Sequence, residues 1–334
     1  MEATFDLSLF GNVALPLVVR PKSAKKRGDW LGLVRQHAAE FRAKLLEHGG
    51  LLFRDFPFEN AAHFEALIAA LGTGRSVDYI GGDSPRNKVR GGVYTSTEAP
   101  AAVKIPLHNE LSFVRHYPKH IYFFCDVAPD RDGETIIADA RRVHDALDAA
   151  VRDRFVEKQL KYVSCYYGHS RVMDLLNSFQ PSHKSWREVF ETDDRETVER
   201  LCREHEFSYD WHDDNWIRIS QTRPARMQHP DTGEWVWFSQ AHLYDFNPRL
   251  LGLWRWVGAK IFYAQKHMRL HEIFHADGSR VARADLYHIL DTLDRSTISF
   301  PWRRGDVLVL DNVLAMHGRA TFTGRRRILA AMTS

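Results

Sequence analysis

The triplet His108-Asn109-Glu110 carries two side chains that can share a metal ion. Side chains two positions apart along a strand point to the same face, so this imidazole and this carboxylate can lie side by side. A second histidine from a distant segment, for which His317 is the candidate, would complete a set of two histidines and one carboxylate. Such a set binds Fe(II) on one triangular face and leaves the opposite positions open for a co-substrate and O2.

An isolated His-x-Glu triplet is weak evidence, and with 18 histidines a later histidine is nearly guaranteed. The order of the surroundings makes the signal specific. The triplet follows Ile105-Pro106-Leu107, and His317 comes after Gly-Asp, four apolar residues and Asp-Asn. An arginine-rich segment, 325–327, begins about ten positions further on. Together these features favour a metal centre with an arginine that holds an anionic co-substrate.

Two of the three consecutive arginines compete for the role of anion anchor. Arg325 and Arg327 share a strand face, so the period of two residues alone does not separate them. Arg327 adjoins the apolar strand predicted at 328–332, whereas Arg325 follows Gly324 in a turn. Arg327 is therefore the preferred anchor, and Arg326 is expected on a solvated edge.

Composition sets broad limits on the class of protein. The chain has 334 residues, 44% of them hydrophobic, and a formal charge of only +3, without a long basic stripe, so nucleic-acid binding is not expected. No apolar run approaches the roughly 18 residues of a membrane span, and Glu2, Asp6 and Pro16 argue against a signal peptide. Three cysteines without a Cys-x-x-Cys pair fit a reducing cytoplasm.

The periodicity of apolar residues predicts strands with helical insertions. Helical spacing predicts helices over 30–48, 143–156, 248–267 and 284–293. Apolar and β-branched runs predict strands at 121–127, 135–138, 307–310 and 328–332. Because no repeat or linker divides the chain, one domain over 1–334 is expected. A jelly roll suits this order, since it can place early and late strands beside one another.

These motifs resemble the TauD/TfdA-type Fe(II)/2-oxoglutarate dioxygenases, and within them the SyrP-like proteins of nonribosomal peptide pathways. The resemblance spans nearly the whole chain. Its blocks are 94–98, 107–112, 133–135, 137–139, 229–234, 236–238, 240–243, 300–302, 305–308, 311–312, 317–319 and 326–327. It implies a mainly β fold with α insertions around a double-stranded β-helix (jelly-roll) core of the clavaminate synthase-like type.

The resemblance implies that His108, Glu110 and His317 are the iron ligands. Glu110 stands where the wider superfamily more often has Asp, and it argues against a halogenase, which lacks this carboxylate so that chloride can bind. Arg327 matches the arginine that grips the C5 carboxylate of 2-oxoglutarate, and Thr135 matches the hydroxyl that supports it. Fe(II), 2-oxoglutarate and O2 are therefore the expected cofactor and co-substrates.

Two further groups are candidates for substrate contact. Ser96, Thr97 and Glu98 precede the metal motif, with a structural turn as the alternative. Gln240 and His242 lie in a block shared with the family and either line the pocket or occupy packed positions in a sheet.

The resemblance implies hydroxylation of an amino acid, free or held as a thioester on a peptidyl carrier protein, in antibiotic or other natural-product biosynthesis. Desaturation, epoxidation and cyclisation are alternatives that differ in how the substrate is placed.

Two other classes of protein stay open. The same ligands suit a Zn(II) hydrolase, although an arginine and threonine anion site has no obvious purpose there. A catalytically silent jelly-roll binding protein is the other, and the intact ligand set argues against it.

Overall fold

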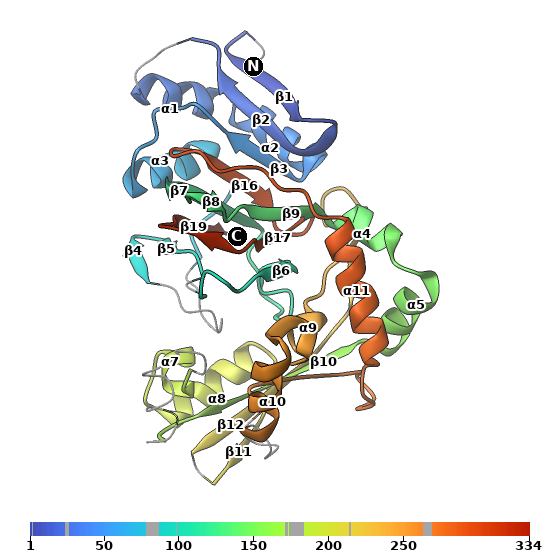
Figure 1. Cartoon of the computed structure of the whole chain (residues 1–334). Helices are drawn as coiled ribbons and strands as arrows, with labels where there is room; N and C mark the ends of the chain where they lie inside the picture. The colour runs from blue at the N-terminus through green and yellow to red at the C-terminus, as the bar shows by residue number, and fades with distance from the viewer. Residues whose placement is uncertain are drawn as a thin grey trace.

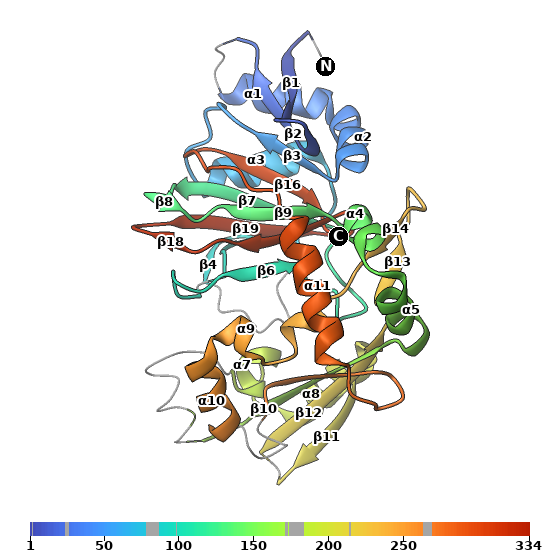
Figure 2. The ribbon, with the colours of Figure 1, turned by 45° about the vertical axis from the view of Figure 1, so that its right-hand side comes forward.

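The computed structural model describes residues 1, 3–23, 27–77, 87–97, 99–170, 173, 184–213, 215–262 and 269–334. Its largest sheet joins early and late parts of the chain (Figures 1 and 2). In spatial order its eight strands are β1 (Phe5–Phe10), β2 (Val13–Pro21), β3 (Gly50–Phe53), β16 (Val307–Asp311), β7 (His120–Val127), β19 (Arg327–Thr333), β5 (Val93–Thr95) and β4 (Lys88–Arg90). All neighbours are antiparallel except β2 and β3.

A second, three-stranded sheet has the order β6 (Ile105–His108), β17 (Ala315–Arg319) and β9 (Thr135–Asp139). One core cluster joins the two sheets, with Ile137 and Ala315 from the small sheet packing among Phe123, Leu310 and Ile328 from the large one. This pair of sheets is the predicted jelly-roll core. A short pair, β8 (Arg131–Asp132) with β18 (Phe322–Thr323), extends one edge.

The outer face of the large sheet is covered by α1 (Arg27–Gln36), α2 (Ala38–His48) and α3 (Ala61–Leu71) (Figure 1). The sequence predicts one helix over 30–48, whereas the structure divides it at His37. Val34 and Phe41 on either side bury into the same core, so the apolar pattern runs through the break unchanged. The predicted stop is confirmed, because Gly49 adopts a left-handed φ of 74°.

The chain between β9 and β16 adds a helical layer and another sheet. A core cluster over the outer face of the small sheet includes residues of α4 (Ala140–Ala146), α5 (Ala149–Lys158), β14 (Trp235–Trp237), which pairs with β13 (Arg226–Gln228), η1 (Ala241–Leu243) and α11 (Arg283–Arg295). The predicted helix over 143–156 is thus two helices, separated at Leu147 and Asp148. Beyond them lies a four-stranded sheet of β11 (Ser208–His212), β12 (Trp216–Arg223), β10 (Leu160–Tyr167) and β15 (His271–Phe274).

Short helices accompany this outer sheet. They are α7 (Trp186–Phe190), α8 (Arg195–Glu204), α9 (Pro248–Leu251) and α10 (Leu253–Phe262). The predicted helix over 248–267 is interrupted at Gly252, whose φ of 76° lies in the region that favours glycine. Within the described ranges, no helix is both long and apolar enough to cross a bilayer.

A buried ion pair ties β3 to the loop that precedes β16. Arg54 and Asp306 are 3% and 1% exposed, and Arg54 Nη2 lies 2.6 Å from Asp306 Oδ2. Arg54 Nη2 also donates to the carbonyl of Pro301, at 2.8 Å. Burying two charges is favourable only when each is fully satisfied by its partner and neighbours, so neither can be removed alone without a large cost.

Replacing Asp306→Ala is expected to lower the free energy of unfolding by about 3–5 kcal/mol, because it leaves a guanidinium buried without its counter-charge. The measurement is urea denaturation followed by circular dichroism. The matched control is Glu204→Ala, which breaks the exposed pair between Arg200 and Glu204 on α8 and should cost no more than about 0.5 kcal/mol. Equal losses in the two variants would contradict the special role of the buried pair.

Candidate metal centre and adjoining pocket

The pairing of β6 with β17 places His108 directly opposite His317. Their rings lie 4.4 Å apart between centroids, and His317 Nε2 lies 3.5 Å from Glu110 Oε2. One ligand atom from each of the three residues falls within 4.8 Å of the others. Donor atoms that each lie about 2.1 Å from an ion are at most about 4.2 Å apart. Small side-chain adjustments would therefore bring all three onto one ion.

The protonation of His108 suits a metal ligand. Its Nδ1 lies 2.9 Å from the carbonyl oxygen of Pro106, which can only accept, so Nδ1 carries the hydrogen and Nε2 keeps its lone pair. Burial, with His317 as the second cause, lowers the pKa of His108 to about 3. The imidazole is thus neutral at ordinary pH, the state in which histidine binds metals.

Two buried asparagines fix the backbone of Glu110. Asn312 Oδ1 accepts the backbone N–H of Glu110 at 2.7 Å, and its Nδ2 donates to the carbonyls of Glu110 and Pro118. Asn109 Nδ2 in turn donates to the carbonyl of Asn312 at 2.7 Å. This asparagine clamp, Asn109 with Asn312, joins the first metal motif to the turn before the second. In the sequence both asparagines stand beside the metal motifs, but the contact between them is visible only in the structure.

The turn that leads into β17 is built on Asp311. Its Oδ1 accepts the backbone N–H groups of Val313 and Leu314, at 2.8 and 2.9 Å. His229 Nε2 lies 3.1 Å from the other carboxylate oxygen. The end of β16, the turn and the start of β17 are thereby held in one conformation, which fixes the point from which His317 projects.

A small pocket opens beside His108 and His317. Among its lining residues are Ser96, Thr97 and Thr135, all three of which the sequence predicts at the site. Thr135 is buried and lies opposite Arg319 in the register of β9 and β17. The pocket therefore combines the two imidazoles with a hydroxyl group from β9 and two from the segment that follows β5.

The structure does not bring Arg327 to this pocket, and the prediction that it anchors the co-substrate is wrong. Its side chain is 51% exposed, with Nη1 2.8 Å from Asp126 Oδ2 on the outside of the sheet. Arg326 lines the pocket instead, so its expected place on a solvated edge is also wrong. The reason is that side chains alternate between the two faces along β19. Ile328 and Ala330 face the core between the sheets, and Arg326, an even number of positions away, points to the same side, whereas Arg327 points to the other.

Arg326 and Arg319 together make one end of the pocket cationic. Arg326 Nε donates to the carbonyl of Gly133 at 2.7 Å, and burial, reinforced by Arg319, lowers its pKa to about 10. Arg319 is buried and donates to three carbonyls in the segment 99–103. In the described part of the chain neither guanidinium has a carboxylate within ion-pair distance. A bound anion would supply the missing counter-charge.

Two further candidates for substrate contact, Gln240 and His242, stand apart from the pocket. His242 is fully buried and donates from Nε2 to the carbonyl of Leu107 at 2.9 Å, and burial lowers its pKa to about 4. It supports β6 from behind, so a substrate contact was the wrong interpretation for this residue. Gln240 is buried and does not line the pocket either. Glu98 lies outside the described residues.

Comparison with known proteins gives a family for the chain. Residues 23–333 match the family described as taurine catabolism dioxygenase TauD, TfdA family. The dapdiamide synthesis protein DdaC of Enterobacter agglomerans is 32% identical over 288 residues, covering 86% of this chain and 83% of DdaC. A clavaminate synthase-like protein of Arabidopsis thaliana is 28% identical over 330 residues, covering 95% and 93%.

Solved structures agree in fold. The crystal structure of PvcB from Pseudomonas aeruginosa superposes with a TM-score of 0.54 at 14% identity, covering 98% of this chain and 90% of PvcB. PvcB is described as an Fe, α-ketoglutarate dependent oxygenase. The finer likeness to SyrP-like proteins stays a prediction. The chain belongs to the taurine catabolism dioxygenase TauD, TfdA family and is an Fe(II)- and 2-oxoglutarate-dependent dioxygenase.

Proposed function

We propose that this dioxygenase hydroxylates an amino acid, free or held as an aminoacyl thioester on a peptidyl carrier protein, in natural-product biosynthesis. The relative DdaC, 32% identical, is named for the synthesis of dapdiamide, which supports a biosynthetic role. Ser96 and Thr97 line the metal pocket and offer hydroxyl groups to a polar substrate. Desaturation, epoxidation and cyclisation remain alternatives within the same chemistry, because they differ only in which substrate bond faces the metal.

We propose that Fe(II) is held by His108, Glu110 and His317, because one ligand atom from each lies close to the other two. When bound, iron and 2-oxoglutarate would supply the oxidising chemistry, with succinate and CO2 as products. We assign the far carboxylate of 2-oxoglutarate to Arg326, with the hydroxyl of Thr135 donating to the same group. The ring of Phe123, whose centre lies 5.1 Å from that of His317, also lines the pocket and adds an apolar surface beside this histidine.

Succinate formation shows which molecule is the substrate. Purified enzyme with Fe(II), 2-oxoglutarate and O2 would be supplied with single amino acids and, separately, with the same aminoacyl groups loaded on carrier proteins. Substrate-dependent succinate together with a product heavier by one oxygen atom supports hydroxylation when the substrate has no alkene that could form an epoxide of the same mass. A product lighter by two hydrogen atoms supports desaturation instead.

The expected cytoplasmic location rests on the three cysteines, all of which are free and buried.

Replacing Glu110→Ala is expected to lower substrate-dependent succinate formation at least 100-fold, because it removes the carboxylate of the ligand set. Fe(II) binding under anaerobic conditions should weaken in parallel. The control is His116→Ala, whose ring lies beside that of His205 outside the ligand set. Unchanged succinate formation in the Glu110 variant would refute the metal assignment. A parent enzyme that binds the metal but never forms succinate would favour the hydrolase or the silent binding protein.

Replacing Arg326→Ala is expected to raise the KM for 2-oxoglutarate roughly 100-fold. Loss of one partner of a buried charge pair costs about 3 kcal/mol, and each 1.4 kcal/mol corresponds to a factor of ten. Arg327→Ala removes the same charge from the neighbouring position, where the side chain is exposed and paired with Asp126, and should change KM less than about twofold. Steady-state assays of succinate formation measure both KM values. A larger rise in KM for Arg327→Ala than for Arg326→Ala would assign the binding of the 2-oxoglutarate carboxylate to Arg327.

Replacing Asn312→Ala is expected to weaken Fe(II) binding about 10- to 100-fold, because Glu110 loses the amide that holds its backbone. Anaerobic metal titration measures this effect. Asn247→Ala is the matched control, since Asn247 is equally buried but caps α9, away from the metal pocket. If both variants bind Fe(II) equally well after correction for folded fraction, the clamp has only a structural role.

A further inference from the structure

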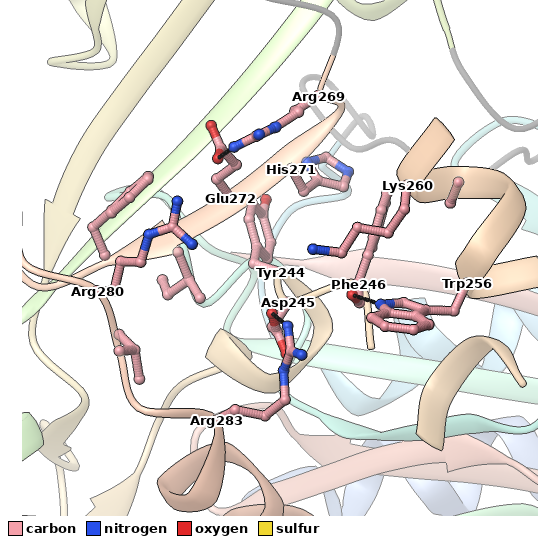
Figure 3. A pocket seen from close by; sticks show the side chains of 14 residues that line it. Tyr244, Asp245, Phe246, Trp256, Lys260, Arg269, His271, Glu272, Arg280 and Arg283 are labelled. Carbon is pink, nitrogen blue, oxygen red and sulfur yellow. Dashed lines mark hydrogen bonds and ion pairs between the residues drawn. The ribbon is translucent and has the colours of Figure 1, made fainter. Parts of the chain in front are cut away.

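A second cavity, of about 430 Å³, shares none of its described lining residues with the metal pocket (Figure 3). It is lined by residues 244–246, α10, β15 and the segment that leads into α11. Cavities of this size accommodate small organic molecules. The proposed reaction uses none of its side chains, so its chemistry needs a separate explanation.

The cavity, called the basic pocket below, has more cations than carboxylates. Its charged lining residues are Lys260, Arg269, Arg280, Arg283, Asp245 and Glu272. Both carboxylates already have partners: Arg283 Nε lies 3.1 Å from Asp245, and Arg269 Nη1 lies 2.8 Å from Glu272. Among the residues described, Lys260 and Arg280 have no carboxylate within ion-pair distance. Two positive charges therefore remain uncompensated at neutral pH.

These two cations reach the cavity from different elements. Figure 3 shows Lys260, from α10, and Arg280 pointing from opposite walls into the space in front of Tyr244 and His271. The ammonium of Lys260 lies 5.6 Å from the centre of the Trp256 ring. The backbone of Arg280 is fixed by a bridge to Phe274. Because like charges that face one cavity repel, an anion between them would lower the electrostatic energy.

Aromatic rings form the floor of the basic pocket. The ring of His271 lies 4.6 Å from that of Tyr244, which is buried, and 6.2 Å from that of Phe246. Trp256 is held in place by its Nε1, which donates to the carbonyl of Phe246 at 3.1 Å. Such rings offer a preformed apolar surface to a flat or aliphatic body.

We propose that the basic pocket binds a phosphate monoester attached to an aromatic or other apolar body. A phosphate monoester carries nearly two negative charges at neutral pH, which matches Lys260 and Arg280, whereas a carboxylate would compensate only one of them. The apolar body would pack on the rings of Tyr244, Phe246 and Trp256. This ligand is distinct from 2-oxoglutarate, whose proposed anchor, Arg326, belongs to the other pocket.

Isothermal titration calorimetry with phenyl phosphate tests the proposal. The protein would first be saturated with Mn(II) and N-oxalylglycine, a 2-oxoglutarate analogue, so that the metal pocket is filled. Phenyl phosphate is expected to bind at one site, at least tenfold more tightly than either inorganic phosphate or benzoate. The double variant Lys260→Ala/Arg280→Ala should weaken this binding at least tenfold.

The control variant, Arg35→Ala/Arg142→Ala, removes the same charge from α1 and α4 and should bind phenyl phosphate as the parent does. Arg326→Ala must also leave this binding unchanged, which keeps the test independent of the proposed function. Retained thermal stability shows that the Lys260/Arg280 variant folds. Absence of saturable binding by the parent, equal weakening in the control, or equally tight binding of benzoate or inorganic phosphate would overturn the proposal.

Discussion

The hydrogen-bonded register of β17 between β6 and β9 is the constraint on which the metal pocket depends. It sets His317 opposite His108 on one side and Arg319 opposite Thr135 on the other. A slip of one residue would turn His317 to the opposite face of the sheet. Hydrogen bonds outside the strands oppose such a slip: the asparagine clamp holds the end of β6, and His242 holds the carbonyl of Leu107.

The electrostatics of the pocket follow from this register. The ligand set brings two imidazoles and one carboxylate into a buried space, and burial keeps His108 neutral. At the other end, Arg319 and Arg326 stay cationic although neither has a carboxylate within ion-pair distance among the described residues. Groups that can bind a cation and groups that can bind an anion are therefore in place before any ligand arrives. Such preorganisation removes part of the cost of ordering a co-substrate.

Sequence reasoning joins His108 to Glu110 by a strand period of two, and the motif order identifies His317. The structure brings these three side chains together, although β6 ends at His108 and Glu110 follows it. The sequence did not predict that Arg326, and not Arg327, lines the pocket. Both faces of β19 are buried from Ile328 onward. Its apolar run therefore does not reveal whether the even-numbered or the odd-numbered residues face the core between the sheets. Asn312 was missed for a different reason: its amide contacts Glu110, 202 residues earlier, and this contact exists only after the sheets have paired.

The two pockets depend on different parts of the chain, and this separation has a consequence for specificity. The metal pocket is formed mainly by paired strands of the jelly roll, where the insertion or deletion of one residue would shift the shared register. The basic pocket lies among α10, β15 and the segments beside η1 and α11, which are not strands of the jelly roll, although Tyr244 and Ile273 pack in the same core cluster as Met316 of β17. The ring of Tyr244 contacts Phe113, three residues after Glu110, so the two regions meet through packed aromatic side chains. Substitutions in the inserted elements can therefore alter what the basic pocket accepts while the metal ligands keep their geometry.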